Sequence, residues 1–172
     1  MKKINLFHSI LLVLCFPVML LSDEFSEPET VAINYMLYFF AVEMDKVVKL
    51  THPQTISEFH KSIIQEFNRA KQEGATGEFK AEIDVNLSDE KFEKLSPEDL
   101  YILVIGSSNR RAPKEYLEKM KNIDISVIQK ELINDSTINI TLRYGFPGPN
   151  NIGKLILKLY NGVWMVVGNA PN

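Results

Sequence analysis

The feature that most constrains the fold is a change in hydrophobic period along the chain. Up to residue 120, several stretches repeat their apolar residues at three- and four-residue steps, which is typical of helices packed on one side. From residue 125 onward, apolar and polar residues alternate, as in strands with one buried face. Helices followed by strands predict an α+β fold, with N-terminal helices packed on a curved C-terminal antiparallel sheet.

The first helix is expected to begin near Glu27, where Ser26 and Glu29 have the spacing of a capping box. Nearly every residue from Val31 to Val42 is apolar. At 100° per residue this hydrophobic surface covers almost the whole circumference, so the helix must be covered on most sides.

Shorter signals follow this helix. Val47, Val48 and Leu50 form a narrow apolar stripe, which predicts a short second helix. A third, amphipathic helix is expected to begin at a second capping box, Thr55 with Glu58, and to end before residue 74.

The middle of the chain combines both periods. Residues 79–87 alternate between apolar and polar side chains, which predicts a half-buried strand. Ser96 with Asp99 starts a further helical segment through Ile105, and Pro113 to Met120 indicates another short helix.

The C-terminal third has the pattern of a sheet. Alternation over 137–144 and 154–159 predicts strands, and Asn161-Gly162 between two apolar runs is a strong hairpin signal because both residues tolerate positive φ. We expect a four-strand antiparallel meander from about Ser126 to Gly168. Its apolar face must be covered, and the helices provide the apolar stripes to cover it.

The N-terminus has the pattern of a secretory signal peptide. Lys2 and Lys3 precede an apolar run from Ile10 to Leu21, and the small Ser22 follows before two acidic residues. We expect cleavage near Ser22, which divides the chain into a signal peptide, 1–22, and a single α+β domain, 23–172. The protein is therefore expected to be exported, either to the periplasm or as a secreted protein.

Composition excludes several classes. The apolar run has about 12 residues against the roughly 20 that a bilayer requires, so no permanent membrane span is expected unless the signal peptide stays uncleaved. Cys15 is the only cysteine, and the bulky Leu14 before it disfavours lipoprotein processing, so the mature chain is disulfide-free. After cleavage, 17 basic and 22 acidic residues give a net charge of −5 without a basic block, which disfavours nucleic acid as a partner.

Three segments together resemble the nuclear transport factor 2-like, or cystatin-like, superfamily. They are Tyr38-Phe39-Phe40-Ala41, the run from Asp45 to Pro53, and the closing hairpin from Tyr160 to Val166. They occupy the places of that family's first helix end, second helix and final Asn/Asp-Gly-x-Trp hairpin, although Glu43-Met44-Asp45 replaces the usual Gly-Asp turn. The resemblance implies a cone-shaped cavity between sheet and helices, which enzymes of the superfamily, such as ketosteroid isomerase, line with carboxylate, Tyr or His residues.

Few side chains suggest specific chemistry. Tyr35 and Tyr38 fall within about 60° of one another on the first helix, so both rings could face a cavity, although buried tyrosines usually bond to a nearby backbone group. Trp164, the only tryptophan, is either a core residue or a platform for a ligand. His52 is expected to interact with terminal carbonyls at a helix end and His60 to be solvated, and neither has a metal-ligand pattern.

Two kinds of function remain open. The first is a non-catalytic domain that binds a small apolar ligand or a protein partner, with a homodimer as one arrangement. The alternative is a small pocket enzyme for proton-transfer or dehydration chemistry, which requires a buried carboxylate within hydrogen-bonding reach of Tyr35 or Tyr38. Neither reading requires a cofactor or a metal.

Overall fold

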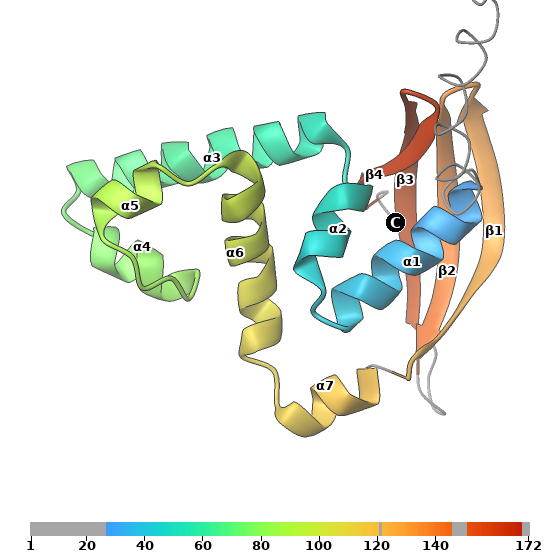
Figure 1. Cartoon of the computed structure of the whole chain (residues 1–172), viewed down its shortest axis with the longest axis horizontal. Helices are drawn as coiled ribbons and strands as arrows, with labels where there is room; N and C mark the ends of the chain where they lie inside the picture. The colour runs from blue at the N-terminus through green and yellow to red at the C-terminus, as the bar shows by residue number, and fades with distance from the viewer. Residues whose placement is uncertain (1–26, 121, 146–150, 170–172) are drawn as a thin grey trace, which may run out of the picture.

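The computed structural model describes residues 27–120, 122–145 and 151–169, with the side chains of 108–110 left aside. It confirms the α+β fold, with helices first and an antiparallel sheet last (Figure 1). The helices are α1 (Pro28–Phe40), α2 (Met44–Leu50), α3 (Pro53–Gln72), α4 (Thr76–Glu82), α5 (Asp89–Glu93), α6 (Pro97–Arg110) and α7 (Lys114–Met120). The strands are β1 (Asp124–Asn134), β2 (Thr137–Gly145), β3 (Asn151–Tyr160) and β4 (Val163–Asn169).

The sheet is the expected meander, in the order β1-β2-β3-β4 with antiparallel neighbours. Asn161 and Gly162 form the last hairpin turn with φ values of 50° and 81°, as their sequence predicted. The α2–α3 junction joins the edge of β4 through a parallel bridge between Thr51 and Val166. In that bridge, the His52 N–H donates to the Val166 carbonyl at 2.8 Å.

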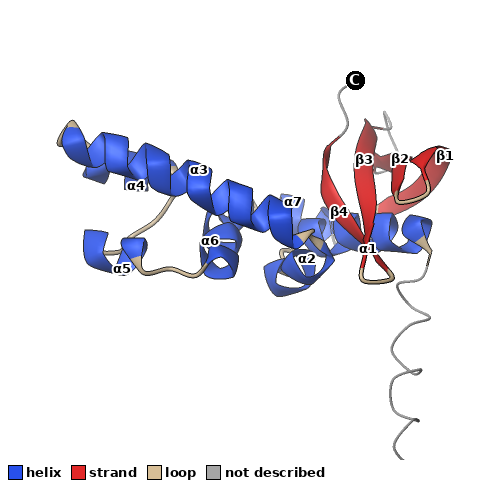
Figure 2. Cartoon of the chain, turned by 90° about the horizontal axis from the view of Figure 1, so that it is seen from above, coloured by secondary structure: helices blue, strands red, loops and turns tan. Residues whose placement is uncertain are grey.

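The main core lies between α1 and one face of the sheet. α1 crosses that face and contacts all four strands (Figure 2). Val31 and Ala32 of α1 and Leu50 of α2 are buried there against six strand residues: Ile138, Ile140, Leu142, Leu155, Leu157 and Val166. As predicted from the apolar run in the sequence, the residues of α1 from Val31 onward are buried or half-buried around the helix.

Helices α3 to α6 extend away from the sheet rather than covering it (Figure 1). α3, a 20-residue helix, has its first residue next to β4 and runs outward to α4 and α5. Its distal half forms a separate core with the neighbouring helices, in which Phe67, Val85, Phe92 and Leu100 are buried. Among the described helices, none is both long and apolar enough to span a membrane.

The strand predicted over residues 79–87 is wrong. Residues 76–82 form α4, a turn with Asp84 at φ 55° follows, and the chain then runs irregularly to α5. Phe79 packs its ring edge-on against Phe67 of α3 and Phe92 of α5, at centroid distances of 5.9 and 6.0 Å. Alternation alone does not make a strand, because a strand also needs a neighbour with which to form hydrogen bonds.

Two further local signals differ in outcome. The predicted helix start at Ser96 and Asp99 is confirmed, because the Asp99 N–H donates to Ser96 Oγ at 3.0 Å and that hydroxyl donates to the Asp99 carboxylate at 2.8 Å. The Thr55–Glu58 box is wrong, since α3 begins at Pro53 and Thr55 Oγ1 instead donates to the Val167 carbonyl. The first predicted box involves Ser26, which lies outside the described residues.

Candidate functional site

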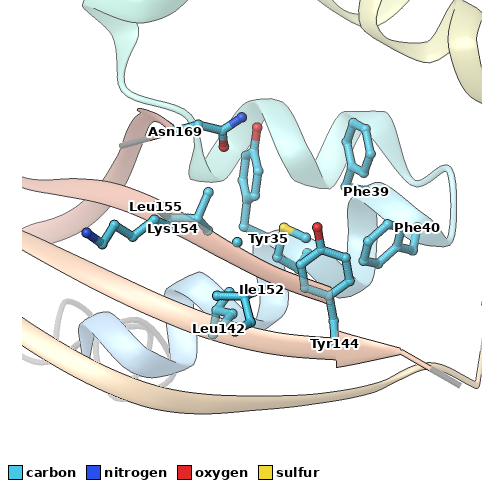
Figure 3. A pocket seen from close by; sticks show the side chains of 11 residues that line it. Tyr35, Phe39, Phe40, Leu142, Tyr144, Ile152, Lys154, Leu155 and Asn169 are labelled. Carbon is cyan, nitrogen blue, oxygen red and sulfur yellow. The ribbon is translucent and has the colours of Figure 1, made fainter. Parts of the chain in front are cut away.

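A pocket of about 710 Å³ lies between the C-terminal half of α1 and the ends of β2 and β3 (Figure 3). This volume is within the range of small-molecule sites, roughly 300–1,000 Å³. The lining residues come from α1 (Tyr35, Met36, Phe39, Phe40), β2 (Leu142, Tyr144), β3 (Ile152, Gly153, Lys154, Leu155) and the last residue of β4, Asn169.

The spacing of these residues explains why they meet. On α1, Phe39 follows Tyr35 by four positions, so both lie on one face of the helix. On β2, Leu142 and Tyr144 are two positions apart, so both side chains lie on the face of the sheet that packs against the core. Leu142 pairs with Gly153 near the start of β3, which brings this part of β3 into the same wall of the pocket.

Tyr35 contributes its ring to the pocket, while its hydroxyl is used within the protein. The side chain is mostly buried, and its hydroxyl shares hydrogen bonds with Tyr101 of α6 and Thr51 at the α2–α3 junction. Burial raises the pKa of the Tyr35 phenol far above its usual value, and its interaction with Tyr101 adds to this rise. Tyr35 is therefore a neutral, fixed wall of the site.

Gly153 makes room for the Tyr144 ring. A Cβ at position 153 would lie 3.0 Å from Tyr144 Cε1, closer than ordinary van der Waals contact. On its other side the Tyr144 ring lies 5.4 Å from the Phe40 ring, in a tilted arrangement. The glycine thus permits an aromatic wall that joins β2 to α1.

Polar groups contribute to the lining of the pocket as well as apolar ones. Among the described lining residues they include the phenol of Tyr144, the amide of Asn169 and the half-buried Lys154, and none of those residues is Asp or Glu. In Figure 3 the Lys154 ammonium extends to the side of the site away from Phe39 and Phe40. Such a lining suits a molecule that has both an apolar and a polar part better than a strongly charged one.

The structure separates the three residues that the sequence singled out for ligand binding. Tyr35 lines the pocket, whereas Tyr38 and Trp164 do not belong to its described lining. Tyr38 packs toward α2, where Lys46 Nζ lies 4.7 Å from the centre of its ring. Trp164, paired with Leu159 across the last hairpin, packs against the main core at the other end of the sheet.

The histidines have structural surroundings that differ from expectation. His52 caps the start of α3 rather than the end of a helix, because its Nδ1 accepts a hydrogen bond from the Gln54 N–H at 3.2 Å. Burial lowers the pKa of His52, and the positive charge of Lys158 adds to this. His60 is half-buried rather than solvated, and its Nε2 has no hydrogen-bond partner among the described residues.

Metal-ligating side chains do not gather in the described part of the chain: within it, no group of three or more His, Cys, Asp or Glu is placed to hold a metal ion.

Sequence reasoning missed most of the aromatic wall. Phe39 could have been found, because it repeats the position of Tyr35 one helical turn later. Tyr144 could not have been found in this way, because its position opposite α1 depends on which residues of β2 and β3 pair. Tyr144 pairs with Asn151, and the length of the connection between the two strands does not dictate this register.

Comparison of the chain with protein-family models, with curated proteins and with solved structures found no match. The superfamily resemblance stays a prediction from the sequence.

Proposed function

We propose that this protein binds a small, predominantly apolar ligand in the pocket between α1 and the ends of β2 and β3, without catalysing a reaction. The observation that carries the proposal is the pocket itself, about 710 Å³ in volume and walled by aromatic and aliphatic side chains. Large, mostly apolar pockets with a few polar groups are the usual form of small-molecule sites.

The lining supports binding over catalysis. The enzymatic alternative needs a carboxylate beside Tyr35 or Tyr38 as a general base. The described lining contains none, and the Tyr35 hydroxyl already has partners in Thr51 and Tyr101. Because its hydroxyl is already hydrogen-bonded within the protein, the Tyr35 ring forms part of the pocket wall and does not donate to a ligand.

Export and superfamily membership belong to the same proposal. The charged start and apolar run of residues 1–22 support export as a signal peptide. The sequence segments quoted above support a distant relationship to the nuclear transport factor 2-like superfamily. An exported protein with an apolar pocket could carry or sense a poorly soluble molecule outside the cytoplasm.

Pocket filling tests the proposal. The neutral fluorophore N-phenyl-1-naphthylamine serves as the probe, because its emission rises in an apolar site. Gly153→Ala should weaken its binding by roughly fivefold or more, since the new methyl group displaces the Tyr144 ring. Gly77→Ala is the matched control, because a Cβ there meets nothing within 4 Å on α4.

A second pocket-filling variant is needed because the Tyr144 ring could move aside and leave the pocket open in Gly153→Ala. Met36→Phe enlarges a side chain on the opposite wall, on α1, and should also weaken the probe. Circular dichroism confirms that each variant is folded. Binding of the probe with equal affinity by the wild type and both filling variants would place the site elsewhere, and a wild type without affinity for it would refute an apolar ligand site.

A further inference from the structure

Exposed large hydrophobic side chains gather at one end of the sheet. In the described part of the chain, five of them lie in or beside the two hairpin turns, with exposed fractions between 39% and 62%. They are Leu132 and Ile133 near the β1–β2 turn and Leu159, Tyr160 and Val163 around the β3–β4 turn. Isolated apolar side chains are common on surfaces, but a group of five around two adjacent turns is not.

The register places both turns at the same end. Thr137, the first residue of β2, pairs with Lys158, and the Leu159 N–H donates to the Ser136 carbonyl at 2.9 Å. The β1–β2 turn therefore lies against the last residues of β3. We call these five side chains the hairpin patch.

The described chain also begins at this end. Lys130 of β1, two positions before Leu132, forms an ion pair with Glu29 in the first turn of α1. Burial raises the Glu29 pKa, but the hydrogen bond from Lys130, a backbone hydrogen bond and the positive charge of Lys130 together outweigh it, so the pKa is lowered. Figure 1 shows the start of α1 beside the strands, below the two turns. The described chain therefore begins next to the hairpin patch, and the apolar run Ile10–Leu21 precedes it in the sequence.

We propose that the hairpin patch docks on the lipid bilayer that the N-terminal apolar segment enters, for as long as that segment stays attached to the domain. An apolar segment that enters a bilayer holds the adjoining surface close to the lipid, and that surface carries the hairpin patch. Tyr160 suits the boundary between headgroups and acyl chains, and the exposed Lys158 suits anionic headgroups. The ligand pocket lies at the other end of the strands, near Tyr144 and Asn151, and thus faces away from the membrane.

Trp164 provides the readout, because it is the only tryptophan and follows Val163 in the hairpin. The full chain is mixed with vesicles of phosphatidylethanolamine and phosphatidylglycerol, and bound protein is separated by flotation. Vesicles with brominated acyl chains quench a nearby tryptophan. The patch variant combines Leu132→Ser with Ile133→Ser. The matched control combines Ile128→Ser with Tyr116→Ser, which are 42% and 47% exposed and lie away from the turns.

The expected result is quenching of Trp164 in the wild type and the control. The patch variant should partition about tenfold more weakly and lose most of the quenching, since two apolar side chains no longer enter the lipid. Failure of the wild type to float, or equal quenching in patch and control variants, would overturn the proposal. So would a wild-type dimer in solution that the patch variant abolishes without any change in vesicle binding, because a second copy would then be the occupant.

Discussion

The buried Tyr35 phenol makes a quantitative prediction about alkaline stability. Its pKa in the folded protein is raised well above the usual value of about 10 that it has in the unfolded chain. The stability that this difference contributes is therefore complete below about pH 10, and it is lost as the pH rises further, because only the unfolded chain releases the proton. At about pH 11 the loss from this one residue is about 1.4 kcal/mol.

Tyr35→Phe isolates this effect. At neutral pH the variant should be less stable by about 1 kcal/mol, since the hydrogen bonds to Thr51 and Tyr101 are lost. Between about pH 8 and 11, however, it should lose about 1.4 kcal/mol less than the wild type. Urea unfolding followed by circular dichroism gives the free energy of unfolding at both pH values.

The control is Tyr116→Phe on α7, which removes a phenol that is 47% exposed. It should retain the full wild-type loss between the two pH values, because it leaves the buried Tyr35 phenol in place. If Tyr35→Phe loses as much stability as the wild type over this range, the phenol is not buried as described, and Tyr35 does not form a neutral wall of the pocket.

Two further predictions concern the hairpin and the outer helices. Gly162→Ala should destabilise the protein by roughly 1–2 kcal/mol, because Gly162 has φ 81° and open space around its Cα, so that only backbone strain changes. The midpoint of urea unfolding checks this, and an unchanged midpoint would contradict it. Asp89 accepts a hydrogen bond from Lys80 at 2.5 Å, which lowers its pKa, so its contribution is present above about pH 4 and lost as the pH falls through the lowered value. Thermal melts at about pH 6 and 3 should show a smaller drop for Asp89→Asn than for the wild type, and parallel drops would refute the role of the pair.

Signals contained within a few residues predicted the structure well. Asn161-Gly162 specifies its turn because both residues adopt positive φ without help from the rest of the protein. Ser96 and Asp99 likewise satisfy each other within one helical turn. At α3, two local signals competed: Pro53, which is favourable in the first helical turn, set the start, and Thr55 became available to bond β4.

Features that depend on distant partners were not accessible in this way. Residues 79–83 fit both alternation and helical spacing, and the rings of Phe67 and Phe92 decide between them. Similarly, the sequence placed Tyr35 and Tyr38 on adjacent faces of one helix, but the packing of α2 against α1 decided that Tyr38 turns toward Lys46. Trp164 could not be assigned from composition, because its partner Leu159 is set by strand pairing.

The separate core at the far end of α3 has a consequence for how the protein opens. Phe67, Phe92 and Leu100 are buried among helices and not against the sheet, whereas Val31 and Ile140 belong to the core on the strands. The outer helical turns can therefore melt and re-form as one cooperative unit, while amide protons in the strands remain protected from exchange with solvent. The polypeptide thus combines a sheet whose amide protons exchange slowly with a group of outer helices that unfolds with a smaller free energy.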